Sequence, residues 1–164
     1  MKQYTDYRNR FKNVSVYSEN LGGGTQSTVD LHVLKGIPRI QSPDLNGTRD
    51  INLDLVAIKN YKPDKFNDVD GGAIKELNIM YRIMGCPHLI QLLDVEILMI
   101  NDKMILRIMI PYHTSDLNNF IKDVTFSVRL NHSKIIIDQL LNALLQLSIK
   151  GIIHRDIKPD NILC

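Results

Sequence analysis

One short run near the end of the chain constrains its fold more than any other feature: HRDIKPDN, residues 154–161. It follows a long apolar segment with helical character and precedes the apolar pair Ile162 and Leu163. A surface loop of random composition would seldom hold a His, an Arg, an Asp, a Lys, a Pro and an Asn in this order. We therefore interpret the run as a functional loop that follows a helix.

Upstream of that loop, the pattern predicts five strands. Residues 13–34 alternate apolar and polar side chains on both sides of Gly22-Gly23-Gly24, which predicts a hairpin. Residues 35–50 collect Gly, Pro, Ser, Asn and Asp and predict an exposed loop insertion. A β-rich run at 51–61 predicts a third strand, and runs at 89–100 and 104–110 predict two more, joined by a tight turn.

Two segments predict helices. Between Ala73 and Met84, apolar residues recur at helical spacing and Gly85 supplies a stop signal; the apolar positions are Ile74, Leu77, Tyr81 and Met84. A longer helix is predicted from Ser133, as the N-cap, to Lys150. Its apolar residues occupy much of its circumference, so we expect burial on more than one side.

The glycine turn has two interpretations when taken alone. Gly22-Gly23-Gly24-Thr25-Gln26-Ser27-Thr28-Val29 fits a G-x-G-x-x-G-x-V frame, with Ser27 at the third glycine position. Glycines let a backbone approach phosphate groups closely, but they also serve any tight hairpin. A dinucleotide-binding turn would need a helix directly afterwards, whereas residues 27–34 alternate like a strand, so that interpretation is excluded.

A lysine and a glutamate form a candidate pair. Lys59 is the single charge in the tetrapeptide Val56-Ala57-Ile58-Lys59 at the end of the third strand, within reach of phosphates beneath the glycine turn. Glu76, on the helix that follows, is a candidate anionic partner that would orient the lysine. The alternative is that both are solvated surface residues. We expect Ile74, Leu77 and Met80 to set that helix against the sheet.

Together these features resemble the eukaryotic serine/threonine protein kinases. The glycine frame, VAIK, the helix glutamate and HRDIKPDN occur in the order of that family, and the likeness runs from about Val14 to the end of the chain. It implies an α+β, protein kinase-like fold: a five-stranded antiparallel N-lobe with one helix, and the start of a helical C-lobe. The implied division is an extension at 1–12, the N-lobe at 13–110, a hinge at 111–113 and the C-lobe at 114–164.

The resemblance also implies a role for each site residue. Lys59 would bind the α and β phosphates of ATP while paired with Glu76. Asp156 would be the catalytic base, Lys158 would neutralise charge at the transferred phosphate, and Asn161 would bind Mg²⁺. The turn over the phosphates would consist of Leu21, Gly22, Gly23, Gly24, Thr25, Gln26, Ser27, Thr28 and Val29.

The adenine site and the branch of the family follow from the same likeness. Val29, Ala57 and Leu163 would enclose the adenine ring in the cleft between the lobes. The hinge would include Ile110 as gatekeeper, followed by Tyr112 and His113. The stretches AIKE at 73–76, PHLIQLLDV at 87–95 and SDL at 115–117 resemble the cyclin-dependent kinase branch, so a cyclin-like partner is a hypothesis alongside protein substrates.

The sequence ends at Cys164, before the Asp-Phe-Gly and Ala-Pro-Glu motifs of that family. The main magnesium ligand of the family lies in the first of these motifs, so we expect impaired transfer by this chain, and we expect an exposed apolar face on the 133–150 helix. Three hypotheses stay open: a kinase whose reading frame continues, a non-catalytic module that binds nucleotide or a partner, and a decayed fragment.

Bulk properties exclude several other classes. A net charge of +2 argues against nucleic acid or an anionic membrane as a partner. No secretory signal and no run of about 18 apolar residues is present, so we expect an intracellular protein of the cytoplasm or nucleus. Cys86 and Cys164 lie far apart in the sequence, which predicts free thiols.

Overall fold

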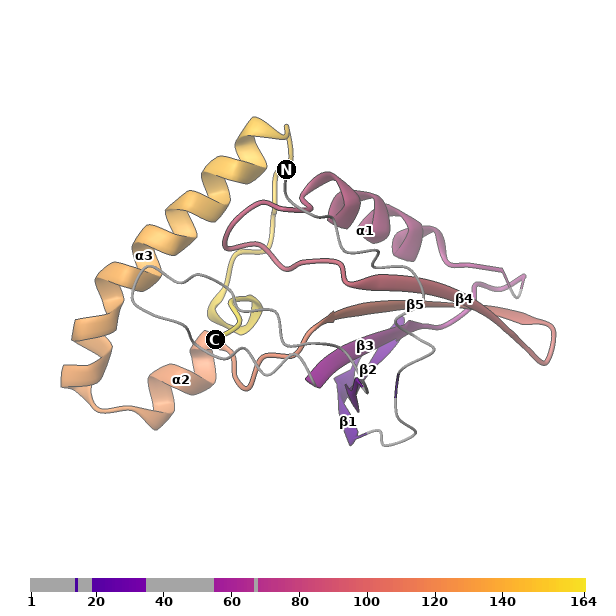
Figure 1. Ribbon diagram of the computed structural model, residues 1–164, viewed down its shortest axis with the longest axis horizontal. Helices are drawn as coiled ribbons and strands as arrows, with labels where there is room; N and C mark the ends of the chain where they lie inside the picture. The colour runs from indigo at the N-terminus through magenta and orange to yellow at the C-terminus, as the bar shows by residue number, and fades with distance from the viewer. Residues whose placement is uncertain (1–13, 15–18, 35–54, 67) are drawn as a thin grey trace. The chain divides into compact units, whose positions relative to one another are not determined.

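The computed structural model describes Val14 and residues 19–34, 55–66 and 68–164 (Figure 1). The predicted extension at 1–12 and the predicted insertion at 35–50 lie outside these residues. The chain forms two compact units. The first unit comprises the described residues up to Asn78 together with Leu92–Tyr112, and the second comprises Ile79–Gln91 and His113–Cys164.

The first unit is built on a five-stranded sheet in which every neighbouring pair is antiparallel, so the predicted α+β fold and strand number are confirmed. Its spatial order is β1-β2-β3-β5-β4. The strands are β1 Glu19–Gly23, β2 Ser27–Val33, β3 Leu55–Tyr61, β4 Asp94–Ile100 and β5 Lys103–Pro111. Figure 1 shows β4 and β5 as a long hairpin.

The β4–β5 hairpin differs from its prediction at one end. Its tight turn is confirmed: Asn101 and Asp102 have φ angles of 50° and 59°, as a two-residue turn between right-twisted strands requires. The strand predicted from residue 89 begins instead at Asp94. The side chain of Gln91 donates to the carbonyls of Cys86 and Leu89 at 2.9 and 2.7 Å, and these bonds hold the preceding residues in a loop.

Helix α1 spans Gly71–Arg82, two residues earlier at each end than predicted. Its start is fixed by Asp70, whose carboxylate accepts bonds from the backbone N–H groups of Gly72 and Ala73 at 2.8 and 3.1 Å. The predicted buried face is partly wrong. Ile74 is 53% exposed, whereas Ala73 and Met80 are buried. The small Ala73 side chain lets the helix backbone come close to its neighbours.

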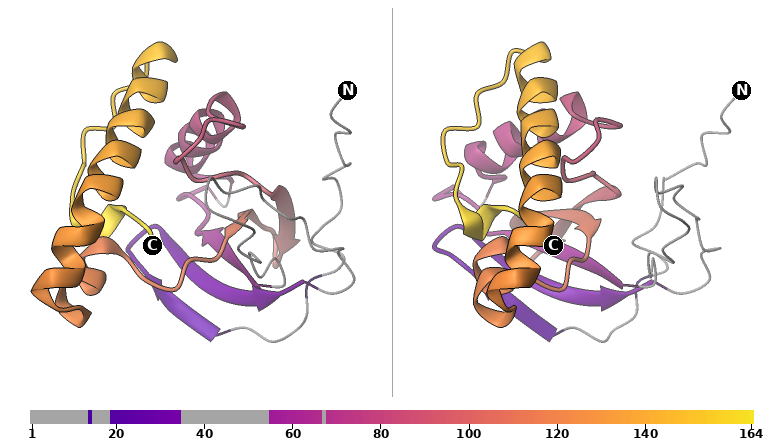
Figure 2. Two further views of the ribbon diagram at one scale, coloured as in Figure 1. Left: turned by 60° about the vertical axis from the view of Figure 1, so that its left-hand side comes forward. Right: turned by 90° about the vertical axis from the view of Figure 1, so that its left-hand side faces the viewer.

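In the second unit, α2 spans Leu117–Asp123 and α3 spans Phe126–Ile149. The predicted N-cap at Ser133 is wrong, because α3 begins seven residues earlier, after Thr125. The Ser133 hydroxyl bonds back to the carbonyl of Leu130 at 2.7 Å, which is how a serine is accommodated inside a helix. After α3 the chain turns back and ends beside the start of α2, where Asp116 pairs with Leu163 (Figure 2).

The two faces of the sheet carry different side chains. Lys59 and Ala57 of β3 lie on one face, because alternate residues of a strand point to the same side. The other face holds a core of Leu34, Val56, Ile58 and Met109. On that second face, beside the core, a chain of polar side chains crosses all five strands: Asn20, Asp30, Asn60, Arg107 and Glu96, joined by bonds of 3.0, 2.7, 3.0 and 3.0 Å.

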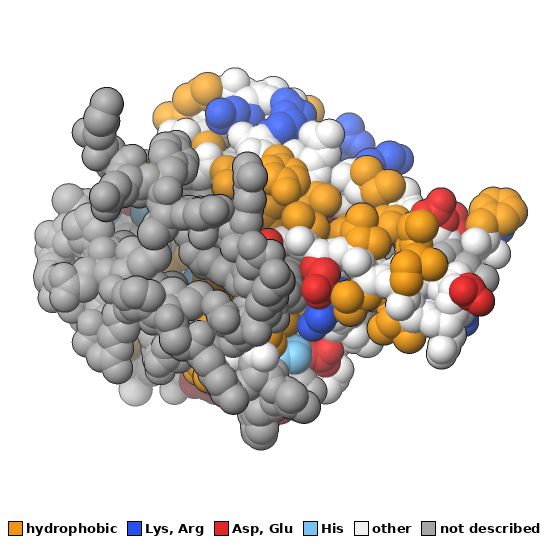
Figure 3. Space-filling view, turned by 45° about the vertical axis from the view of Figure 1, so that its right-hand side comes forward, with side chains coloured by type: hydrophobic (Ala, Val, Ile, Leu, Met, Phe, Trp, Pro, Cys, Tyr) orange, Lys and Arg blue, Asp and Glu red, His pale blue; other side chains and the backbone are white. Residues whose placement is uncertain are grey.

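Hydrophobic side chains remain at the surface of both units, and Figure 3 shows many of them on one face. In the first unit they include Ile97, Met99 and Ile100 of β4. In the second unit, α3 buries only Ala143 and Leu147. The apolar side chains of α3 that are more than half exposed are Phe126, Leu130, Ile135, Ile137, Leu141, Leu145 and Ile149, so burial on several sides is not observed and the predicted exposed face is confirmed.

A small cluster holds the second unit together. Ile83, Cys86 and Leu147 are buried against one another, with Leu144 and Ile152 packed around them. Arg82 adds a hydrogen bond from its guanidinium to the carbonyl of Lys150. Both cysteines are free thiols, as predicted. Among the residues described, none of the helices combines the length and the apolar character that crossing a membrane would require.

Candidate active site

The glycine turn joins β1 to β2 as predicted. The Gly24 N–H donates to the carbonyl of Ser27 at 2.9 Å and closes the turn. A side chain at Gly23 would lie 2.6 Å from that same carbonyl oxygen, and Gly22 has a φ of 136°, so these two positions require glycine. Leu21 lies in a bulge between Asn20 and Gly22 and is 40% exposed. The turn leaves its own backbone exposed toward solvent.

The tip of this turn is also held from β3, by a residue that the sequence interpretation missed. The backbone N–H of Lys62 donates to the carbonyl of Gln26 at 2.9 Å. Its ammonium bonds the carbonyl of Thr25 at 3.1 Å and approaches that of Gly24 at 3.5 Å. Lys62 follows the strand that ends at Tyr61, and strand pairing with β2 explains why it reaches the turn. Periodicity alone carried no signal for it.

Lys59 and Glu76 are brought together. The ammonium of Lys59 donates to both carboxylate oxygens of Glu76, at 2.8 and 2.9 Å. The side chains are 26% and 43% exposed, so the pair is partly withdrawn from water but still open to an incoming anion. Of the two interpretations of these residues, the geometry matches the paired one. The geometry fixes a positive charge on the face of the sheet that also carries Ala57.

Strand pairing places three more of the predicted residues around that lysine. Val29 of β2 lies directly opposite Lys59, and Ile110 of β5 lies directly opposite Ala57. Ala57 is 5% exposed, and its small side chain is therefore buried beside Lys59 on this strand. Beyond β5, Tyr112 ends the first unit and His113 begins the second. Thr28 lies opposite both Gly23 and Asn60, so its side chain points to the other face of the sheet, away from Lys59.

The candidate catalytic loop lies in the second unit, and its predicted residues also come together. The side-chain N–H groups of Asn161 donate to the backbone oxygen and to Oδ2 of Asp156, both at 2.8 Å. Nζ of Lys158 lies 3.3 Å from the same Oδ2. Arg155 has a φ of 67°, a conformation that costs free energy for a residue with a side chain. The loop is therefore held in an unusual shape by contacts among its own residues.

A second set of bonds fixes the end of that loop to α2. The N–H of Leu117 donates to the carbonyl of Ile162 at 2.7 Å, and the N–H of Cys164 donates to the carbonyl of Ser115 at 2.8 Å. The amide of Asn118 donates to Asp160 at 3.0 Å. Leu163, the predicted adenine neighbour, lies within this bridge and is 46% exposed. These bonds make α2, which the sequence interpretation did not delimit, part of the support for the loop.

The bonds to Asp156 also set its protonation. Its hydrogen bond with Asn161, and next its bond with Lys158, lower the pKa of Asp156 below the ordinary value of 3.8. The carboxylate is ionised at neutral pH and is 64% exposed, so a hydroxyl from solvent or substrate can reach it. Such a group accepts a hydrogen bond and orients the hydroxyl that donates it.

The described residues suit a metal ion that is coordinated mainly by a bound nucleotide and by water, with few protein atoms. No three His, Cys, Asp or Glu side chains within the described part of the chain are grouped so as to bind a metal ion. Asn161 uses its amide nitrogen on Asp156, so its amide oxygen is the atom that a cation would take. Mg²⁺ in nucleotide sites binds one or two protein oxygens, with phosphate oxygens and waters completing the shell. The residues present therefore fit Mg²⁺ bound with a nucleotide.

Comparison with known proteins supports a common family for both groups of residues. A family model described as the protein kinase domain matches residues 45–164. The serine/threonine-protein kinase crk1 of Schizosaccharomyces pombe is 34% identical over 109 residues, which are 66% of this chain and 31% of that protein. The probable serine/threonine-protein kinase KIN28 homolog of Encephalitozoon cuniculi is 31% identical over 157 residues, which are 90% of this chain and 46% of that protein.

A third relative, the serine/threonine-protein kinase ssn3 of Aspergillus niger, is 33% identical over 119 residues, or 65% of this chain and 26% of that protein. The chain thus spans less than half the length of each of these relatives. The family model covers well over half of the chain, and it includes both Lys59 and the whole of the HRDIKPDN loop. The prediction made from those residues is confirmed at the level of the family: the chain belongs to the protein kinase family, and the relatives that it matches are serine/threonine-protein kinases.

Proposed function

We propose that this chain binds ATP with Mg²⁺ and transfers the γ-phosphate to a serine or threonine hydroxyl of a protein substrate. The observation that carries the proposal is the arrangement around Asp156, whose carboxylate is ionised, exposed and fixed by Asn161 and Lys158. A carboxylate of this kind is suited to take the proton of an attacking hydroxyl. The protein kinase family supplies ATP as the phosphoryl donor.

The residues of the first unit would bind the nucleotide. The exposed backbone of the glycine turn would lie along the phosphates, and the ammonium of Lys59, oriented by Glu76, would bind phosphate oxygens. Val29 and Ala57 are assigned to the adenine ring, with Ile110, Tyr112 and His113 along its edge. Leu163 is assigned to the ring on the family resemblance alone.

The residues of the second unit would act on the acceptor hydroxyl. Asp156 would orient the hydroxyl and accept its proton as the oxygen attacks phosphorus. Lys158, whose ammonium is 50% exposed, would neutralise charge on the transferred phosphoryl group. Asn161 would give its amide oxygen to Mg²⁺ while its nitrogen holds Asp156. Bound Mg²⁺ would supply positive charge to the phosphate oxygens.

For the organisation of the chain, we propose a kinase N-lobe at 13–110, a hinge at 111–113 and the start of a C-lobe at 114–164. We also propose a cyclin-like protein as a partner of α1. The exposed Ile74 of the AIKE stretch supports this assignment, since a 53% exposed isoleucine on a helix offers a partner an apolar contact. A mixture of cyclins that neither binds the chain nor alters its activity in a pull-down would count against that partner.

The proposed activity is tested by γ-³²P transfer from ATP to dephosphorylated casein, comparing the chain with Asp156→Ala. We expect weak transfer by the unmodified chain, in line with the impaired transfer expected from the sequence, and a further loss of at least about 100-fold in the variant, since general base catalysis typically contributes that much. Equal signals would exclude Asp156 as the base. Binding of ATP by both proteins, with transfer by neither, would support the alternative: a non-catalytic module that binds nucleotide.

A further inference from the structure

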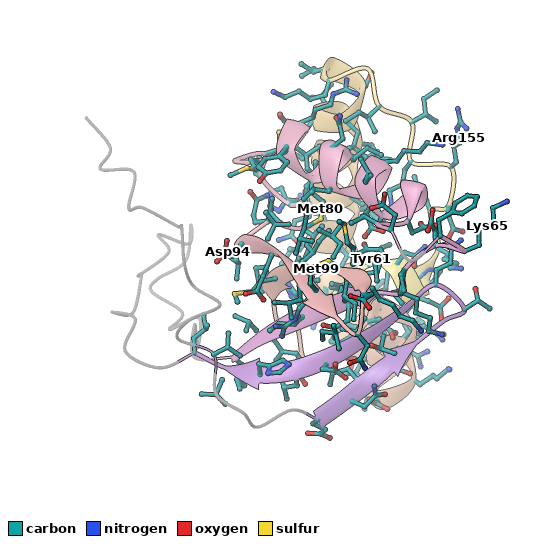
Figure 4. All side chains as sticks on the ribbon, turned by 90° about the vertical axis from the view of Figure 1, so that its right-hand side faces the viewer. Tyr61, Lys65, Met80, Asp94, Met99 and Arg155 are labelled. Carbon is teal, nitrogen blue, oxygen red and sulfur yellow. The ribbon has the colours of Figure 1, made fainter. Side chains whose placement is uncertain are left out.

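A third side chain lies against the Lys59–Glu76 pair. Tyr61 is two residues after Lys59, so both side chains point to the same side of β3. The ammonium of Lys59 lies 4.9 Å from the centre of the Tyr61 ring, within the range in which a cation is attracted to the negative face of an aromatic ring. Figure 4 labels Tyr61 on the side of the sheet that carries α1. The ring therefore packs against the ammonium.

The hydroxyl of Tyr61 is unusual. Tyr61 is only 5% exposed, and its buried oxygen has no hydrogen-bond partner among the residues that the structure describes. A buried hydroxyl without a partner costs free energy, and most buried polar groups avoid this state. Burial first, and then the nearby Glu76 carboxylate, raise the pKa of Tyr61 well above its ordinary value. The phenol is thus a neutral donor beside a carboxylate that it does not yet bond.

Both carboxylate oxygens of Glu76 accept a hydrogen bond from the ammonium of Lys59. An ammonium has three N–H donors. Once phosphate oxygens bind Lys59, as the proposed function requires, fewer of those donors remain for Glu76. A carboxylate oxygen of Glu76 would then lose a bond, and the buried hydroxyl of Tyr61 beside it is a replacement donor.

From this geometry we propose that Tyr61 is a positioning residue for the Lys59–Glu76 pair. Its ring holds the ammonium in place, and its hydroxyl donates to Glu76 when phosphate oxygens take up some of the N–H donors of Lys59. The inference rests on the proposed nucleotide site. It predicts that the hydroxyl does not stabilise the free chain but raises the affinity for nucleotide. Simple core packing would not produce this combination.

The test compares Tyr61→Phe with the unmodified chain by two measurements: calorimetric titration with ATP and Mg²⁺, and urea unfolding without nucleotide. Removing the hydroxyl should weaken ATP binding by about tenfold, since a hydrogen bond to a charged group is worth about that factor. The urea midpoint of the free chain should stay the same or rise. Tyr81→Phe, at a tyrosine that is 52% exposed, is the matched control and should change neither quantity.

Unchanged ATP affinity in Tyr61→Phe would overturn the role of the hydroxyl, and a joint fall of affinity and urea midpoint would show an ordinary packing role instead. A failure of the unmodified chain to bind ATP would refute the proposed function. The ring is tested without nucleotide by NMR of lysine labelled at Cε. The Lys59 signal should carry a ring-current shift that persists in Tyr61→Phe and disappears in Tyr61→Leu, and an unchanged signal in Tyr61→Leu would overturn the role of the ring.

Discussion

The two groups of candidate site residues are held in place in different ways. Lys59 and Glu76 come from a strand and a helix, and the pair is 26% and 43% exposed. Asp156 and Lys158 come from an irregular loop, and they are 64% and 50% exposed. Regular backbone hydrogen bonding positions the first pair, whereas side-chain bonds within the loop, with a few backbone bonds at its end, position the second.

This difference determines how each group should respond when a single side chain is replaced. A strand and a helix keep their course when one side chain is replaced, because their backbone bonds remain. The loop depends on bonds made by single side chains, above all the amide of Asn161, and it carries the positive φ of Arg155. We therefore expect the loop to be the more easily disturbed of the two.

The substitution Asn161→Asp should have the largest effect on the loop. The substitution keeps an oxygen for Mg²⁺ but removes both N–H donors to Asp156 and brings a second negative charge next to it. We expect phosphoryl transfer to fall by about 1,000-fold, within the range that a positioned general base supplies. The measurement is kcat in the casein transfer assay.

Asn118→Ala is the matched control, because it removes one exposed bond to Asp160 and leaves the two backbone bonds between α2 and the end of the loop in place. It should retain transfer within about threefold, since an exposed polar contact is worth little. If Asn161→Asp kept full activity, the role of Asn161 would be limited to metal binding, and the loop would not depend on its donors.

The core beneath the sheet and the exposed face of α3 differ in packing, and their substitutions should differ in stability. Ile58 is 0% exposed, and Ile58→Ala should lower the free energy of unfolding by about 3 kcal/mol through lost burial and a cavity. Leu141 on α3 is 59% exposed, and Leu141→Ala should change it by less than about 0.5 kcal/mol. Urea unfolding of both variants measures this. Comparable losses would show that the α3 face is covered in solution.

The sequence predicted the strand-borne pair well because periodicity carries that information. Alternation along 51–61 and helical spacing after Ala73 were enough to put Lys59 and Glu76 on facing elements. The same alternation places Tyr61 beside Lys59, so that neighbour was within reach of sequence reasoning. The antiparallel pairing of the sheet followed from the family resemblance, whereas the spatial order of its strands was not predicted.

Errors arose where a side chain competes with the regular pattern. Gln91 bonds backbone carbonyls and keeps the first residues of the predicted strand in a loop. Ser133 resembles an N-cap but bonds backward inside α3, and Thr125, the residue before the helix, makes no side-chain cap that would have marked it. Ile74 fits an apolar stripe yet is exposed, because Ala73 takes the buried position. Local bonds from a side chain to the backbone decided the first two cases and burial decided the third, and the spacing of apolar residues records neither.

On the face of the sheet opposite Lys59, a smaller effect is expected at the polar chain. Asn60 donates to Asp30 at 2.7 Å and accepts from Arg107 at 3.0 Å, so Asn60→Ala breaks the chain at its centre. We expect a loss of about 1–2 kcal/mol in the free energy of unfolding, because partly buried partners lose their bonds. Asn20→Ala removes one exposed bond at the edge and should cost less than about 0.5 kcal/mol. Equal losses in urea unfolding would show that position within the sheet does not matter.

The smallest expected effect is on the acid titration of Asp156, which reports whether the bonds of the loop persist in solution. The pKa of this carboxyl is lowered in the folded chain, first by Asn161 and then by Lys158. The bonds therefore stabilise the folded loop at pH values above the ordinary value of 3.8, and this contribution disappears as the pH falls through the lowered pKa. NMR of carboxyl-labelled aspartate would follow the titration directly.

Asn161→Ala and Lys158→Ala should each move the titration midpoint of Asp156 upward, toward 3.8, whereas Asn118→Ala should leave it in place. High salt should reduce the contribution of Lys158 more than that of Asn161, because screening weakens an exposed charge pair more than a short hydrogen bond. An Asp156 that titrates at its ordinary value in the unmodified chain would mean that the loop bonds do not persist in solution. The greater susceptibility of the loop relative to the Lys59–Glu76 pair would then have to arise from backbone mobility rather than from the loss of single side-chain bonds.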